Sequence, residues 1–129
     1  MGRSHFDMPA TVTLDAILDA YDGFLIDAYG VLVDKQGALP GAAELLARLE
    51  RAGRPWLILT NSASRLPETL SAEFAELGLP VAPSRLLTAG AMLSVYFAEE
   101  GLAGSRCVVL GPADAHRYVE RAGAGRSCE

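Results

Sequence analysis

The chain has 129 residues and a formal net charge of −5 at pH 7, and 50% of its residues are hydrophobic. This length allows at most one domain, and the hydrophobic content is enough for a packed core. The acidic balance and the lack of a basic cluster argue against nucleic acid as the main partner. No apolar run approaches the length of a membrane span, so the sequence predicts no membrane insertion.

The two ends and the cysteines set the expected boundaries. Residues 1–10 hold no apolar segment, so we expect a flexible N-terminus without a signal peptide. The core is expected over residues 11–123, followed by a loose polar tail over residues 124–129. Cys107 lies in a predicted strand and Cys128 in the tail, which does not make a disulfide framework. A reducing cytoplasm is therefore the expected location.

The first predicted elements are a short amphipathic helix and a buried strand. Apolar residues recur at helical spacing through residues 11–21, with a threonine as the expected cap. Residues 24–27 are three apolar residues that run into Asp27, which is typical of a strand in a parallel sheet. Ligands of open α/β sheets bind beyond the carboxyl ends of the strands, so Asp27 occupies an expected functional position. Gly30 allows the backbone to turn sharply away.

A flap, a helix and a second strand are predicted next. Residues 28–39 contain two glycines and alternating apolar residues, which favours a tight turn and a small β-flap. Residues 40–53 have helical apolar spacing, with a proline near the start and a glycine at the end. Residues 55–59 are a second apolar strand, and Thr60 follows. Successive parallel strands are neighbours with a right-handed crossover, so we expect Asp27 and Thr60 to face one another across a crevice.

The rest of the chain continues the alternation and predicts an α/β fold. Further helices are expected over residues 66–77, 89–100 and 114–122, and further strands over residues 86–88 and 106–110. Met92 and the aromatic residues near it are expected in the core rather than in a cofactor site.

Asp27, Thr60 and the backbone amides that follow Thr60 together suit a phosphate group. A carboxylate can attack phosphorus, while a hydroxyl and the amides at a helix N-terminus can hold the phosphate oxygens. The sequence therefore predicts a phosphate as the bound group.

Several short motifs, taken in order, resemble one family. They are Phe24-Leu25-Ile26-Asp27 with Gly30-Val31-Leu32, Leu39-Pro40-Gly41-Ala42 with Glu44, Leu59-Thr60-Asn61, Thr88-Ala89-Gly90-Ala91 and Val108-Val109-Leu110-Gly111. This set resembles the haloacid-dehalogenase-like (HAD) hydrolase superfamily and, within it, the subfamily IIA or NagD-like phosphatases. The resemblance covers residues 20–123 and implies a Rossmann-like three-layer α/β/α core with a parallel sheet. It implies the N-terminal half only, without the cap and the C-terminal half of the core.

The resemblance also implies a small phosphorylated metabolite as the ligand, and it implies roles for individual residues. Asp27 matches the nucleophile that forms an aspartyl-phosphate, and Thr60 matches the hydroxyl that orients the phosphoryl oxygens. The Asn61 amide would assist, and Gly30 belongs with these substrate-binding residues. In the family a Mg²⁺ ion is held partly by the nucleophile, here Asp27, and by the backbone carbonyl two residues on, here Tyr29.

The residue at position 29 departs from the family pattern. HAD phosphatases usually carry a second aspartate there, as the general acid, whereas this chain has Tyr29. A tyrosine hydroxyl, with a reference pKa of about 10, is poorly matched to that task at neutral pH. The run Asp27-Ala28-Tyr29-Gly30 also resembles the first motif of 2-haloacid dehalogenases, which need no metal. Those enzymes insert a helical cap between the first two motifs, and residues 28–59 leave room for only a flap and a helix.

The later family motifs have no counterpart here. The family uses a third-motif lysine and a fourth-motif acidic pair, but the only lysine is Lys35, in the predicted flap. The sequence therefore predicts an inactive or weak enzyme as it stands. A receiver domain of phosphorelay signalling needs a similar lysine and acidic pair, which disfavours that alternative. A non-catalytic half-domain that associates through an unfinished sheet edge remains open, and it predicts a homodimer or poor solubility.

Overall fold

The computed structural model describes residues 10–125, so most of the expected flexible N-terminus and of the expected tail lies outside it. Its elements in chain order are α1 (Leu14–Ala20), β1 (Phe24–Asp27), β2 (Val33–Asp34), β3 (Gly37–Ala38), α2 (Ala42–Arg51), β4 (Trp56–Thr60), α3 (Pro67–Glu76), the 3₁₀ turn η1 (Pro83–Arg85), β5 (Leu86–Thr88), the 3₁₀ turn η2 (Ala89–Met92), α4 (Leu93–Glu99) and α5 (Ala113–Arg121). Over this range, no helix has both the length and the apolar character needed to cross a membrane.

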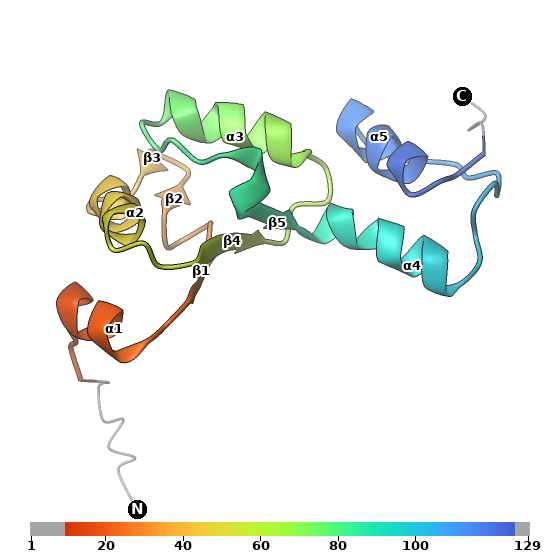
Figure 1. Cartoon of the computed structure of the whole chain (residues 1–129). Coiled ribbons are helices and arrows are strands. Elements are labelled where there is room, and N and C mark those ends of the chain that lie inside the picture. The colour runs from red at the N-terminus through yellow and green to blue at the C-terminus, as the bar shows by residue number, and fades with distance from the viewer. Residues whose placement is uncertain (1–9, 126–129) are drawn as a thin grey trace, which may run out of the picture.

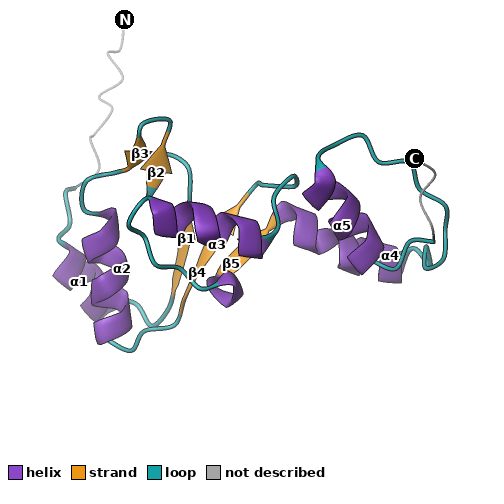
Figure 2. Ribbon diagram, turned by 90° about the horizontal axis from the view of Figure 1, so that it is seen from above, coloured by secondary structure: helices purple, strands orange, loops and turns teal. Residues whose placement is uncertain are grey.

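The organising element is a parallel sheet with strand order β1-β4-β5. Ile26 pairs with Ile58, and Ile58 pairs with Leu86, so one buried row crosses all three strands. Each new strand is added on the same side of the previous one. Because parallel crossovers are right-handed, α2 and α3 come to lie on the same face of the sheet (Figures 1 and 2). The predicted α/β fold with a parallel sheet is confirmed.

In the part of the chain that the structure describes, helices cover one face of the sheet and leave the other exposed. The first face carries the core, which joins buried residues of the strands to those of α2 and α3; among them are Leu46, Leu49, Leu70 and Phe74. On the second face, Leu25, Leu59 and Leu87 are 72%, 47% and 37% exposed. We call these three leucines the bare face. Within residues 10–125, the helical cover of this sheet is therefore one-sided.

A glycine with a left-handed backbone conformation flanks helix α2 at each end. Gly41 precedes it with φ +84°, and Gly53 follows it with φ +62°, both in the left-handed region. The Gly53 N–H donates to the Glu50 carbonyl and the Arg54 N–H to the Leu49 carbonyl, which satisfies the last turn. This confirms the helix that was predicted from its flanking proline and glycine.

Trp56 is a buried aromatic residue at the start of β4. The Trp56 side chain is 3% exposed, and the Arg85 guanidinium lies 4.6 Å from the centre of its ring. Arg85 also donates to the Trp56 carbonyl at 3.0 Å. This contact ties the start of β4 to the turn that precedes β5.

The predicted flap is present as the antiparallel pair β2 and β3. Asp34 closes its turn, because its Oδ1 accepts from the N–H groups of Gln36 and Gly37. Lys35 is an exposed residue of this turn.

The strand predicted over residues 106–110 is wrong. These residues have no strand pairing, and Val108 and Leu110 are 79% and 95% exposed. Their apolar pattern is suited to a strand, but a strand also needs a neighbour for its backbone hydrogen bonds. In the described sheet that neighbour is missing, so the segment simply links α4 to α5.

The helix predicted over residues 89–100 is divided, and part of its expected burial is wrong. A 3₁₀ turn (η2) comes first and α4 follows. Phe97 is buried, but Met92 and Tyr96 are 50% and 54% exposed. The reason is that α4 packs against α5 and η2 rather than across the sheet, so only one side of the helix is buried.

Candidate active site

Asp27 is the last residue of β1, at the carboxyl end of the strand. Side chains alternate along a strand, so Asp27 lies on the same side of the sheet as Leu25 and its register partner Leu59. Its Oδ1 accepts from the Ala28 N–H at 2.8 Å. The carboxylate is otherwise exposed and available to a ligand.

A cavity of about 340 Å³ adjoins this carboxylate. It is lined by Leu25, Ile26, Asp27, Leu59 and Asn61. Its walls are therefore apolar, and the polar groups come from the residues at the ends of two neighbouring strands. That arrangement is typical of a small-molecule site in an open α/β sheet.

Thr60 ends β4, one residue beyond the level of Asp27 in the register. It pairs with Thr88 and, by alternation, shares the side of Ile58 rather than that of Asp27. Its Oγ1 lies 3.4 Å from the Ser62 N–H, which donates to it. The structure thus brings Asp27 and Asn61 to one cavity and places Thr60 beside it at the adjacent strand end. The functional roles of these residues remain predictions.

A tight turn follows Asp27 and leads the chain into the flap. Gly30 has φ +84°, and its N–H donates to the Val33 carbonyl at 2.8 Å. The Ala28 carbonyl accepts from the N–H groups of Leu32 and Val33. Tyr29 lies in this turn with 60% of its surface exposed. The left-handed φ gives the physical reason for glycine at position 30.

Oxygen donors for a metal ion are few near Asp27. Residues 10–125 contain no cluster of three or more His, Cys, Asp or Glu side chains that could hold one. One carboxylate and one backbone carbonyl supply only two of the six oxygens that Mg²⁺ requires, so water and a bound ligand would have to supply the other four. These residues alone therefore do not fit the expected Mg²⁺ site.

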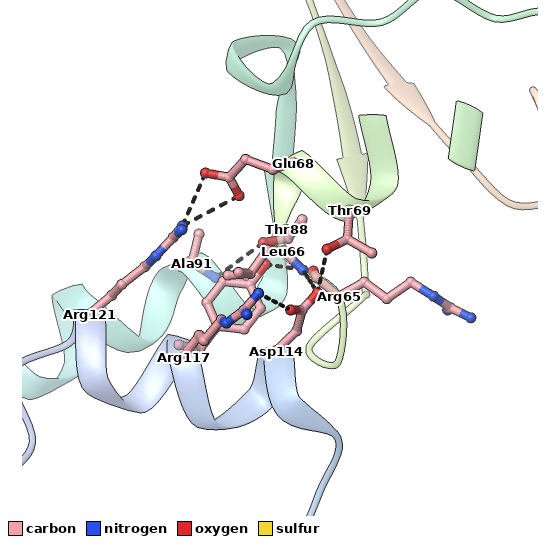
Figure 3. A network of polar contacts seen from close by, with 10 residues as sticks. Arg65, Leu66, Glu68, Thr69, Thr88, Ala91, Asp114, Arg117 and Arg121 are labelled. Atoms are coloured by element: carbon pink, nitrogen blue, oxygen red, sulfur yellow. Dashed lines mark hydrogen bonds and ion pairs between the residues drawn. The ribbon is translucent and has the colours of Figure 1, made fainter. Parts of the chain in front are cut away.

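Polar side chains of α5 contact the segment that leads from β4 to α3 (Figure 3). Asp114 accepts from the Leu66 N–H at 2.9 Å and from Thr69 Oγ1 at 2.6 Å. Tyr118 donates to the Arg65 carbonyl at 2.8 Å. Sequence reasoning gave these two α5 residues no role, because contacts between side chains so far apart in the chain leave no periodic signal.

Comparison with known proteins now adds to this geometry. The family model for haloacid dehalogenase-like hydrolases matches residues 24–125. The chain belongs to the haloacid dehalogenase-like hydrolase family. Human chronophin is 35% identical over 88 residues, which are 68% of this chain and 30% of chronophin. Chicken glycerol-3-phosphate phosphatase is 32% identical over 112 residues, which are 86% of this chain and 36% of that enzyme.

Solved structures agree with this family and fold. NagD from Escherichia coli K-12 has a TM-score of 0.69 and 28% identity, with 80% of this chain and 40% of NagD covered. A Mycobacterium tuberculosis glycerol phosphate phosphatase, solved in complex with magnesium, has a TM-score of 0.73 at 24% identity. The match covers 87% of this chain and 33% of that one. The resemblance to NagD-like HAD phosphatases is thus confirmed, and the chain spans about a third of the curated relatives named above.

Proposed function

We propose that this HAD-family chain carries the nucleophile for hydrolysis of a small phosphate ester, with Asp27 as that nucleophile. The observation that carries the proposal is the exposed Asp27 carboxylate at the end of β1, in one cavity with Asn61. The named relatives chronophin, glycerol-3-phosphate phosphatase and NagD support the phosphate-ester class rather than a particular substrate.

The proposed reaction has two steps. One carboxylate oxygen of Asp27 attacks phosphorus, and the bond from phosphorus to the ester oxygen breaks. The leaving oxygen takes up a proton from solvent, because position 29 offers tyrosine in place of an aspartate. A water molecule then attacks the aspartyl-phosphate, which restores the carboxylate and releases inorganic phosphate. Thr60 and the Asn61 amide would hold the phosphoryl oxygens throughout.

Charge neutralisation is the weak part of this site. The family implies Mg²⁺, but the described donors near Asp27 do not complete its coordination, so no step is derived through the metal. The only lysine, Lys35, lies on the flap turn. We therefore propose that turnover by this chain alone is very slow.

The proposal is tested by hydrolysis of an aryl phosphate with and without Mg²⁺. We expect slow phosphate release from the wild-type chain and none above background from Asp27→Asn, which removes the nucleophile but keeps its size. Asp19→Asn is a matched control, because Asp19 is exposed on α1. Equal rates for wild type and Asp27→Asn would remove the proposed nucleophile.

Two alternatives respond differently to the same experiments. A dehalogenase would release chloride from 2-chloropropionate without metal, but between Asp27 and β4 the chain holds only the flap and α2, without the cap such enzymes insert there. A non-catalytic domain that acts by association is favoured by the bare face.

We also propose that the chain works in the cytoplasm, in keeping with the free thiol of Cys107.

A further inference from the structure

The loop over residues 61–66 presents Asn61 to the cavity, yet it has no regular structure of its own. Most of its residues are exposed, and only its last one, Leu66, is buried. Leu66 is the N-cap residue of α3, and its side chain makes no capping hydrogen bond. Beside the local bond from the Ser62 N–H to Thr60 Oγ1, the conformation of this loop therefore depends on contacts from other elements.

Those contacts come from η2 and α5. The Gly90 N–H donates to the Ser62 carbonyl at 3.1 Å and fixes the first half of the loop. Asp114 on α5 accepts the Leu66 N–H and thereby caps α3 from 48 residues away. Tyr118 donates its hydroxyl proton to the Arg65 carbonyl and fixes the second half.

The Tyr118 hydroxyl is fully satisfied within this cluster. Since its proton goes to the Arg65 carbonyl, Thr88 must donate across the 2.5 Å contact between the two hydroxyl oxygens. Thr88 Oγ1 in turn accepts from the Ala91 N–H at 3.2 Å. Thr88 and Tyr118 are only 1% and 5% exposed, so these bonds are screened from water. The chain of bonds joins the end of β5 to the loop after β4.

The Tyr118 ring can lie there only because residue 90 is glycine. A Cβ at this position would come within 2.4 Å of the ring. The φ of Gly90 is not in the left-handed region, so alanine would be excluded by the ring and not by the backbone. This gives a way to disturb the cluster without removing a polar group.

We propose that α5 is a latch, with Asp114 and Tyr118 as positioning residues that hold the loop 61–66 so that Asn61 faces the ligand cavity. The latch rests on the proposed function for its purpose, because it would fix the phosphate-binding loop. Its physical content, a loop immobilised by α5, can be measured without any ligand.

The test compares the full wild-type chain with Tyr118→Phe, Asp114→Asn and Gly90→Ala. Gly23→Ala is the matched control, since a Cβ there meets only ordinary contacts at 3.5 Å. Backbone amide hydrogen exchange reports on the loop, and NMR shifts of the Asn61 amide on titration with inorganic phosphate report on the site. We expect at least about tenfold faster exchange over residues 61–66 in the three latch variants, with β1 and β4 unchanged. Phosphate affinity should fall several-fold in the same variants.

The possible outcomes separate the two proposals. Unchanged exchange over residues 61–66 in both Tyr118→Phe and Asp114→Asn would overturn the latch. Faster exchange with unchanged phosphate affinity would also overturn it, because α5 would then have a purely structural role. If wild-type Asn61 shows no phosphate shift, the proposed function fails, and the latch is then supported or overturned by the exchange rates alone.

Discussion

At the scale of the residue, Asp114 is distinguished by the hydrogen bonds that its carboxylate accepts from α3 and its N-cap. Hydrogen bonds from Thr69 and from the Leu66 N–H hold the pKa of Asp114 below its ordinary value of 3.8. A depressed pKa means that the ionised form is bound more favourably in the folded chain than in the unfolded one. The carboxylate therefore stabilises the fold above the unfolded pKa, and this contribution is lost as the pH falls through the folded pKa.

This gives a prediction for acid unfolding. The difference in free energy of unfolding between wild type and Asp114→Asn should be constant at neutral pH and shrink below about pH 3.9, where the unfolded carboxylate is protonated. Urea titrations at a series of pH values measure it. Glu120→Gln on the exposed side of α5 is the control and should show no such trend. A difference that persists undiminished at roughly pH 2 contradicts the assignment.

At the scale of the element, α2 is the helix whose packing is most completely predicted by its sequence. Leu49 is 0% exposed and lies in the core cluster that packs against the sheet. Leu49→Ala should lower the free energy of unfolding by about 2–5 kcal/mol, because it leaves a cavity. Leu25→Ala removes the same atoms from a site that is 72% exposed and should cost much less. Urea or thermal unfolding of both variants checks this; equal losses would contradict the described core.

Helices and strands could be predicted from the sequence where apolar residues recur at a regular spacing and glycine or proline lies at the ends. Asp27 could be located in this way too, since an apolar run that ends in a carboxylate indicates a strand end. The exposed segment 106–110 could not, because its apolar residues signal burial only where a neighbouring strand exists. The latch could not either, since the pairing of Asp114 with Leu66 depends on tertiary structure. Sequence reasoning also placed Thr60 opposite Asp27, whereas the register offsets it by one residue and so puts its side chain on the side of Ile58.

At the scale of the whole molecule, the one-sided cover of the sheet is the dominant feature. The bare face presents three exposed leucines, of which Leu25 and Leu59 line the candidate cavity, and β1 has an unpaired edge in the described sheet. Exposed apolar sheet surface of this kind favours association. The homodimer that the sequence predicts through a sheet edge stays a prediction, and the bare face offers a second surface for association.

Sedimentation velocity over a range of concentrations tests that surface. We expect the wild-type chain to self-associate and Leu87→Lys to shift it toward monomer, because a charge on the bare face resists burial. Leu77→Lys is the control, since Leu77 is similarly exposed, at 41%, but lies just after α3 on the other layer. A wild-type chain that stays monomeric at high concentration would argue against association through this face.

The packing of Trp56 under Arg85 has a practical consequence for all of these measurements. The sequence contains a single tryptophan, so its fluorescence arises from one buried site at the start of β4. That indole belongs to the core of the sheet and not to α5 or the flap, so its emission will register opening of that core. An emission that stays constant while amide exchange in another segment accelerates will therefore mark a local opening, and a red shift will mark opening of the sheet core itself.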